Sequence, residues 1–209
     1  MVMIDDAFEP VESMPMVGGD PSLDFVNTGS RRLEGPFRER LGSYGDLVVW
    51  GERAGAIDRR AAGRLRSEAM SRAEEAAEVL ARARALREAI YRLFTSPRPG
   101  AEAAGLDVLN RELVRASSQR RLAGSGERVV WSWAPEIALD RILGVVAVSA
   151  ADLLTGAEVE RVKECGGSNC NWLFRDTSRN RSRRWCDMKD CGNRAKARRY
   201  YARHRHEDG

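Results

Sequence analysis

The chain has 209 residues, of which 43% are hydrophobic and 32% are charged. This length suits one domain, or a large domain followed by a small one. No window approaches the roughly 18 consecutive apolar residues of a membrane span, and the acidic first residues lack the basic and apolar regions of a secretion signal. We therefore expect a cytoplasmic protein without a membrane segment.

The first 28 residues indicate little regular structure. Residues 1–22 are rich in Pro and Gly, which favour turns and loops. Residues 23–28, LDFVNT, predict a short strand or a buried turn. Inside this apolar stretch, Asp24 and Asn27 are a polar pair that could line a ligand pocket. Hydrogen bonds that stabilise a turn are the alternative role for both side chains.

Helices are predicted where apolar residues recur every three or four positions behind a capping residue. We expect them over 44–54 after Ser43, over 59–70 after Asp58, from a capping box of Ser71 and Glu74 to about residue 95, and over 101–118.

The rest of the first domain is predicted to be a hairpin and a buried helix. Residues 120–133 predict a β-hairpin that turns at 124–126. Pro135 suits the first position of a helix over 135–154, and the apolar character of that helix predicts that it is the buried centre of the domain. We therefore expect an α+β fold, mostly α, with a helix-rich domain at 16–157 and a small domain at 158–209.

The four cysteines of the chain are Cys165, Cys170, Cys186 and Cys191, in the pattern C-x4-C-x15-C-x4-C. In a reducing compartment, two close pairs indicate metal ligands rather than disulfides. Four thiolates suit a closed, structural Zn²⁺ site, because a catalytic zinc keeps one position open. Two disulfides, free buried thiols and an iron–sulfur cluster are the alternatives.

The residues around the cysteines predict a treble-clef-like zinc finger. Residues 172–176 and 183–186 suggest two short strands joined by a polar turn, with Trp172, Phe174 and Trp185 as a small core around the metal. Asp187 can cap a helix that carries Cys191 in its first turn. The two histidines lie beyond the last cysteine and are expected to be exposed tail residues.

The charge is concentrated in this second domain. Residues 161–209 carry 14 Lys and Arg against 6 Asp and Glu, whereas residues 1–160 carry 21 against 25. A basic appendage on a mildly acidic body is typical of polyanion binding, although a GC-rich genome also enriches arginine. The candidate nucleic-acid-binding residues are Arg179, Arg181, Arg183, Arg184, Asn193, Arg194, Lys196, Arg198, Arg199 and Arg203. Asn193 could instead cap local structure, and some arginines could offset the negative Zn(Cys)4 centre.

These residues resemble a known pair of domains. The segment from Cys165 onward, with Cys191-Gly192-Asn193-Arg194 as its signature, resembles the CGNR-type zinc finger. GGDPSLDFVNT at 18–28 resembles the opening of the ABATE domain, which precedes this finger in bacterial proteins. The resemblance spans nearly the whole chain from about residue 16. It implies a stress-induced transcription regulator whose finger binds DNA and whose first domain senses or regulates.

The leading hypothesis is a DNA-binding transcription regulator with a structural Zn²⁺. The alternatives are an RNA-binding protein and an adaptor that binds an acidic protein partner. A homodimer and a small-molecule effector are further partners that this arrangement allows. We do not expect an enzyme, because the sequence contains no nucleophile–base constellation, phosphate loop or open metal site.

Overall fold

The computed structural model describes residues 10–30, 37–98, 100, 102–134 and 137–204. Its elements are, in chain order, α1 (Pro21–Val26), β1 (Gly29–Ser30), β2 (Arg38–Glu39), α2 (Tyr44–Arg53), α3 (Arg59–Ser71), α4 (Ala73–Thr95), α5 (Ala103–Gln119), β3 (Arg120–Ser125), β4 (Arg128–Trp133), α6 (Arg141–Thr155), a 3₁₀ turn (Ala157–Arg161), β5 (Val162–Glu164), β6 (Leu173–Arg175), a π turn (Met188–Gly192) and α7 (Asn193–His204). The strands pair antiparallel as β1–β2, β3–β4 and β5–β6. The expected α+β fold with predominant helix is confirmed.

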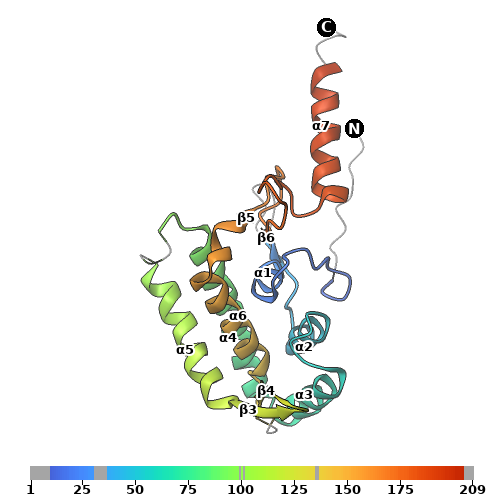
Figure 1. Cartoon of the computed structure of the whole chain (residues 1–209). Helices are drawn as coiled ribbons and strands as arrows, with labels where there is room; N and C mark the ends of the chain where they lie inside the picture. Colours follow the sequence, from blue (N-terminus) through green and yellow to red (C-terminus); the bar gives the residue numbers. More distant parts are fainter. Residues whose placement is uncertain (1–9, 31–36, 99, 101, 135–136, 205–209) are drawn as a thin grey trace.

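Helix α6 forms the centre of the helical body. It contacts α1, α2, α4 and α5, and its side chains at Ile142, Val146 and Ala150 are fully buried. Figure 1 shows α4, α5 and α6 side by side, with α2 and α3 beyond them and α7 projecting from the opposite end to the β3–β4 hairpin. The predicted central position of this helix is therefore confirmed. Among the described residues, no helix is both long and apolar enough to span a membrane.

Two predicted helix starts are confirmed by their caps. The Ser43 hydroxyl accepts a hydrogen bond from the backbone N–H of Asp46 at 3.2 Å, and the Asp46 carboxylate accepts the Ser43 N–H in return. The Asp58 carboxylate accepts the backbone N–H of Ala61 at 2.7 Å. Both caps satisfy N–H groups that the first turn of a helix leaves without partners.

Two other predicted starts are wrong. Ser71 ends α3 instead of opening α4, and α4 begins behind Arg72 without a side-chain cap. The central helix begins at Arg141 rather than at residue 135; Pro135 itself lies outside the described residues. The buried Leu139 precedes the helix, and its carbonyl accepts the Tyr44 hydroxyl at 2.8 Å. The residues just before Arg141 thus make tertiary contacts in a non-helical conformation, although the local sequence pattern predicted a helix there.

The segment predicted as a short strand or buried turn is mostly the helix α1. The Asp20 carboxylate accepts the backbone N–H of Ser22 at 2.9 Å, and Pro21 occupies the first turn. A capping Asp followed by Pro is a strong helix start. It outweighs the strand tendency of the Phe and Val that follow, and α1 buries Leu23, Phe25 and Val26.

The predicted hairpin at 120–133 is confirmed as β3–β4, but its turn lies at residues 126–127 rather than at 124–126, because Gly124 and Ser125 still pair with Val129 and Arg128. Leu122 lies opposite Trp131, and the turn closes between Ser125 and Arg128 with Gly126 at a φ of 60°. Glycine adopts this left-handed conformation without steric cost, which explains its place in the turn.

Candidate metal centre and basic surface

The four cysteines meet at one point, although they come from three separate segments. All four Sγ atoms lie within 4.8 Å of one another. Three of the four residues are buried, and Cys170 is half-buried. The Sγ atoms of Cys170 and Cys186 are 3.7 Å apart, as are those of Cys186 and Cys191. A tetrahedral Zn²⁺ with bonds of about 2.3 Å requires sulfurs about 3.8 Å apart. The site therefore fits a structural zinc ion with four thiolate ligands.

Backbone hydrogen bonds shape the loop that carries the first two cysteines. This loop follows β5, and the Cys165 N–H donates to the Trp172 carbonyl at 2.9 Å. The Cys186 N–H donates to the Cys165 sulfur at 3.3 Å. A Cβ at Gly167 would lie 3.3 Å from the Cys191 sulfur, so glycine allows the loop to approach the metal ligands closely.

The strands of the finger differ from the prediction. Residues 173–175 form β6 as expected, but β6 pairs with β5, not with residues 183–186. Residues 183–186 are not a strand; they run past the metal site, where the Arg184 carbonyl accepts the Gly166 N–H at 2.9 Å. The reason is that the loop from 165 to 170 turns the chain back so that β6 pairs with the strand before the first cysteine.

The predicted aromatic core of the finger is confirmed. Phe174 is fully buried with three of the cysteines, and Trp172 and Trp185 pack against this cluster half-buried. Trp172 also contacts the core of the body, and the guanidinium of Arg40 lies 5.3 Å from its ring.

Asp176, which was not among the predicted site residues, organises the arginine-rich turn at 177–182. Its buried carboxylate accepts hydrogen bonds from the Ser178 hydroxyl at 2.5 Å, the Lys163 ammonium at 2.7 Å and the Arg183 N–H at 3.0 Å. Burial alone raises the pKa of Asp176, but the bonds from Lys163 and Ser178 hold it below its ordinary value. An Asp two residues before a Ser, at the start of a polar turn, is the sequence signal from which this role could have been predicted.

The helix start after the third cysteine follows the prediction. The Asp187 carboxylate accepts the Lys189 N–H at 2.7 Å. Cys191 lies in the π turn that leads into α7. The Asn193 side chain donates to the Lys189 carbonyl at 2.9 Å, so the structure supports its local capping role.

Two of the arginines proposed to bind nucleic acid turn inward instead. Arg183 donates from Nε to the Trp185 carbonyl at 3.0 Å, from Nη2 to the Cys186 carbonyl, and lies 4.4 Å above the Phe174 ring. Arg194 donates from Nη2 to the Cys191 sulfur at 3.2 Å and to the Asp190 carboxylate at 3.0 Å. Arg183 thus holds the finger together, and Arg194 offsets the thiolate charge.

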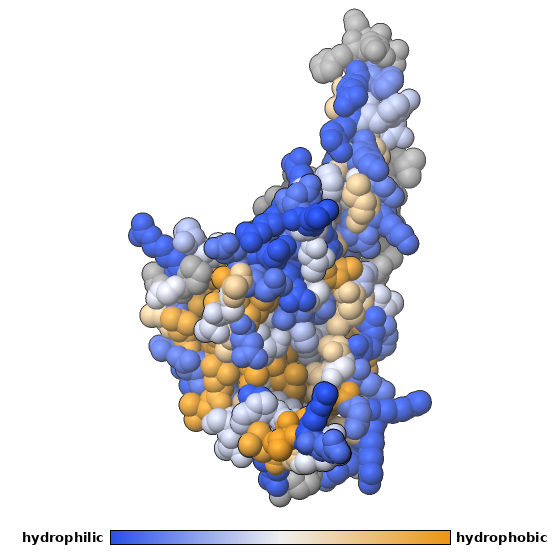
Figure 2. Space-filling model, viewed as in Figure 1, coloured by the Kyte–Doolittle hydropathy of each residue, from blue (hydrophilic) through white to orange (hydrophobic). Residues whose placement is uncertain are grey.

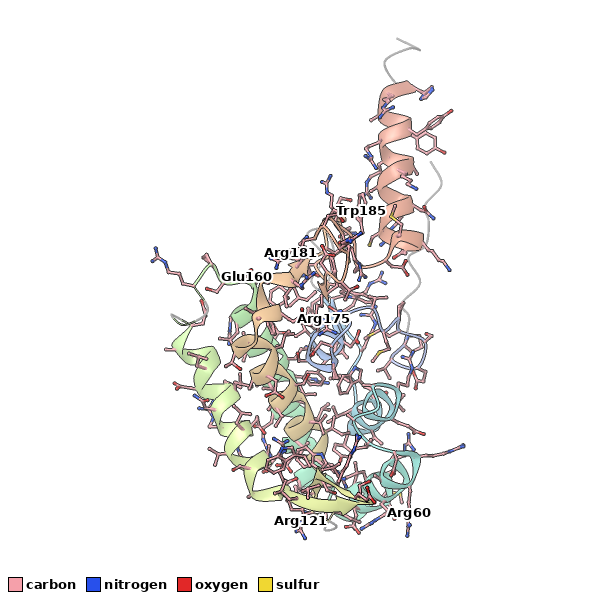
Figure 3. The ribbon with its side chains drawn as sticks, viewed as in Figure 1. Arg60, Arg121, Glu160, Arg175, Arg181 and Trp185 are labelled. Atoms are coloured by element: carbon pink, nitrogen blue, oxygen red, sulfur yellow. The ribbon has the colours of Figure 1, made fainter. Side chains whose placement is uncertain are left out.

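Arg181 is partly engaged as well. It forms an exposed ion pair with Glu160 at 3.2 Å, at the junction of body and finger (Figure 3). The other candidates expose their side chains: Arg179, Arg184, Lys196, Arg198, Arg199 and Arg203. Figure 2 shows hydrophilic side chains gathered over α7 and the finger. The structure therefore separates an exposed basic surface from the arginines that stabilise the fold.

Asp24 and Asn27 connect the body to the finger. The Asn27 side chain accepts the Leu173 N–H at 2.8 Å and donates to the Leu173 carbonyl at 2.9 Å, so it binds the edge of β6 as a strand would. The Asp24 carboxylate accepts the Gly18 N–H at 2.8 Å, and the Gly18 carbonyl accepts the Arg175 N–H at 2.8 Å. These contacts fit the alternative role of both side chains, which is to form hydrogen bonds that stabilise the fold.

The two glycines of the same motif also have structural roles. A Cβ at Gly18 would lie 2.8 Å from the Asp24 nitrogen, and Gly19 has a φ of 74°.

Burial raises the pKa of Asp24 to about 6, with hydrogen bonds from Gly18 and Val17 acting against it. The segment GGDPSLDFVNT therefore packs into the body and docks the finger through Gly18 and Asn27 at its two ends.

Two family models match the chain, one after the other. The family model ABATE, described as a putative stress-induced transcription regulator, matches residues 19–157. The CGNR zinc finger model matches residues 161–204. A comparison with curated proteins gives no match.

Proposed function

Because the chain belongs to the ABATE family, we propose that it is a transcription regulator that binds duplex DNA through α7 and the adjoining turns of its zinc finger. The observation that carries this proposal is the composition and exposure of α7. This helix has five Lys and Arg residues, no Asp or Glu, and no buried residue. A basic helix without an intramolecular packing face is suited to a polyanionic partner.

The dimensions of α7 support a groove-binding role. Its 12 residues correspond to a length of about 18 Å, and the major groove of B-DNA admits one helix. A helix this short is marginal alone in water. The metal centre at its first turn holds it in place, so that the exposed arginines reach the phosphates on either side of the groove.

The helical body has the regulatory part in this proposal. One finger covers little surface, and specific DNA binding by small modules requires a dimer or a second module. We assign dimerisation or effector binding to the body, which keeps a fixed relation to the finger through Asn27, Gly18 and Arg40.

RNA binding is a second candidate, favoured by one observation. Tyr200 and Tyr201 are 59% and 69% exposed on α7. Exposed aromatic side chains beside arginines can stack on unpaired bases. An adaptor for an acidic protein remains the third hypothesis, since the same arginines would serve it.

A salt titration of zinc-loaded protein tests the proposal. Binding to random duplex DNA and to RNA of matched length would be measured by fluorescence anisotropy, with a chelator-treated sample as control. We expect zinc-dependent duplex binding that weakens steeply with salt, because each phosphate contact adds about 0.9 to the slope of log K against log salt.

A matched pair of double variants locates the surface. Lys196→Ala with Arg199→Ala should weaken duplex binding and lower the salt slope by about 2. Arg59→Ala with Arg60→Ala, exposed on α3 in the body, removes the same charge and should have little effect. Equal losses in both variants would exclude α7 as the binding surface. Tight binding to RNA alone would favour the second candidate.

A further inference from the structure

A cavity lies beside the metal centre, between the first cysteine loop and the start of α7. Its volume is about 190 Å³, and it is lined by Gly167, Ser168, Asn169, Cys170, Cys191, Arg194 and Arg198. Cys170 and Cys191 make it contiguous with the metal site, whereas the other two cysteines are not part of its lining. The cavity therefore joins the loop to the basic helix.

The lining has the chemistry of an anion site. It contains two arginines, the exposed hydroxyl-bearing Ser168 and the amide of Asn169, and no carboxylate. Arg194 lies against the Cys191 thiolate and Asp190. Arg198 follows one turn later on the same helix face, and it makes no hydrogen bond or ion pair with another described residue. Of the two arginines that line the cavity, Arg198 is thus the one that no contact within the described residues engages.

We propose that this cavity is a phosphate-binding subsite, in which Arg198 provides the bidentate contact and the loop at 167–169 forms the opposite wall. This inference rests on the proposed function, because the phosphate that we expect in the subsite is one from the backbone of the bound nucleic acid. Free inorganic phosphate presents the same oxygen atoms to Arg198, and it is the second possible ligand of the subsite that the experiment tests.

The electrostatics of the site favour Arg198 over a lysine for this role. A Zn(Cys)4 centre carries a charge of −2 and therefore repels a nearby anion. An anion in this cavity needs a cationic side chain that offsets this repulsion and also holds the anion in one orientation. The planar guanidinium binds two phosphate oxygens at once, which an ammonium does not do. Arg194 screens the thiolate, and Arg198 meets the anion at the cavity mouth. The subsite would set the position of α7 against the nucleic-acid backbone.

Arg198→Gln and Arg203→Gln are the matched variants for the test. Both residues are exposed on α7, but Arg203 does not line the cavity. Inorganic phosphate is titrated into zinc-loaded full-length protein at constant ionic strength, and amide NMR signals of residues 167–169 are followed. We expect saturable shifts in the unmodified protein and in Arg203→Gln. In Arg198→Gln the phosphate affinity should fall roughly tenfold or more, as expected for loss of a charge-assisted hydrogen bond.

Duplex DNA binding is the second arm. Arg198→Gln should lose about tenfold in affinity, and Arg203→Gln should lose clearly less, because it removes a contact outside the cavity. Zinc content is measured for every variant. Loss of zinc from Arg198→Gln would overturn the proposal, because this side chain would then serve the metal centre.

The two proposals fail in different ways. Equal DNA losses in both variants, with no phosphate shifts at 167–169, would overturn the subsite and leave DNA binding by α7 in place. Saturable phosphate binding that depends on Arg198, in a protein that binds no DNA, would support the subsite and exclude the proposed function.

Discussion

At the scale of single residues, polar side chains that look functional in the sequence are used to build the fold. Asn27 binds the backbone of Leu173, and Arg183 binds carbonyls of the finger. Both residues satisfy backbone groups that neither strand nor helix would otherwise pair, and a buried backbone group without a partner costs free energy. An arginine is available to a binding partner only if its side chain is not already bound to other groups of the fold.

Replacement of Asn27 tests this role. Asn27→Ala removes both bonds to Leu173 and leaves a buried N–H and C=O without partners, so we expect a loss of about 2–4 kcal/mol in unfolding free energy. Urea denaturation of the zinc-loaded protein measures it. Asn110→Ala, exposed on α5, should change stability by less than about 0.5 kcal/mol. Equal values for the two variants would contradict the docking role.

The raised pKa of Asp24 predicts a pH dependence of stability. Its pKa is about 6 in the fold against an ordinary 3.8, so the folded state binds a proton that the unfolded chain lacks between these values. Stability should therefore rise as pH falls through 6. Asp20 and Arg53 are the charged neighbours that contribute to this pKa. Relative to Asp24→Asn, the unmodified protein should gain roughly 1 kcal/mol between pH 7 and pH 5.

Chemical denaturation of both proteins across this pH range, with excess zinc, measures the difference. A stability difference that does not change with pH would show that the Asp24 carboxyl has an ordinary pKa in the fold.

At the scale of elements, a capping residue predicted the start of a helix correctly only where no tertiary contact favoured a different start. Ser43 and Asp58 start α2 and α3 as predicted. At Ser71 the helix boundary follows Arg72 instead, whose guanidinium binds Glu75 at 2.7 Å and the Ile137 carbonyl at 3.2 Å. A distant carbonyl of this kind is invisible to a local pattern.

Two glycines inside helices should respond in opposite ways to alanine. At Gly144 in α6, a Cβ would lie 2.8 Å from the Trp133 ring, whereas at Gly63 in α3 it meets nothing within 4 Å. Gly144→Ala should destabilise by about 1–3 kcal/mol through overpacking. Gly63→Ala should stabilise by up to about 1 kcal/mol through helix propensity. Thermal unfolding of both variants compares them, and stabilisation by Gly144→Ala would contradict the close packing of Trp133.

At the scale of the whole molecule, the finger is joined to the body through buried contacts. Leu173 of β6 is buried in the core of the body, and α1 contacts β6. The metal centre organises the finger alone, since all four ligands lie between residues 165 and 191. The two parts therefore share a surface but not a metal.

Removal of zinc should unfold the finger and leave the body folded. We expect Cys191→Ser, or treatment with a chelator, to abolish hydrogen-exchange protection in residues 162–204 because a structural zinc contributes its binding free energy to folding. Protection in α4 and α6 should persist, although reduced by the loss of Leu173 from the core. Simultaneous loss of protection in α4 and α6 would mean that body and finger unfold as one unit.

The amino-acid sequence alone was enough to predict the metal ligands, the extents of α2 and of the β3–β4 hairpin, and the concentration of charge in the finger. These features depend on spacing, capping and turn chemistry among residues close in the chain. Tertiary contacts determine the pairing of β5 with β6, the docking role of GGDPSLDFVNT, and which arginines are held half-buried while others stay exposed. The strand pairing and the docking depend on contacts between separate segments, such as the hydrogen bonds between Asn27 and Leu173. The arginine positions depend on where the folded finger places the carbonyl and sulfur atoms that accept their hydrogen bonds. A local sequence pattern encodes neither kind of contact.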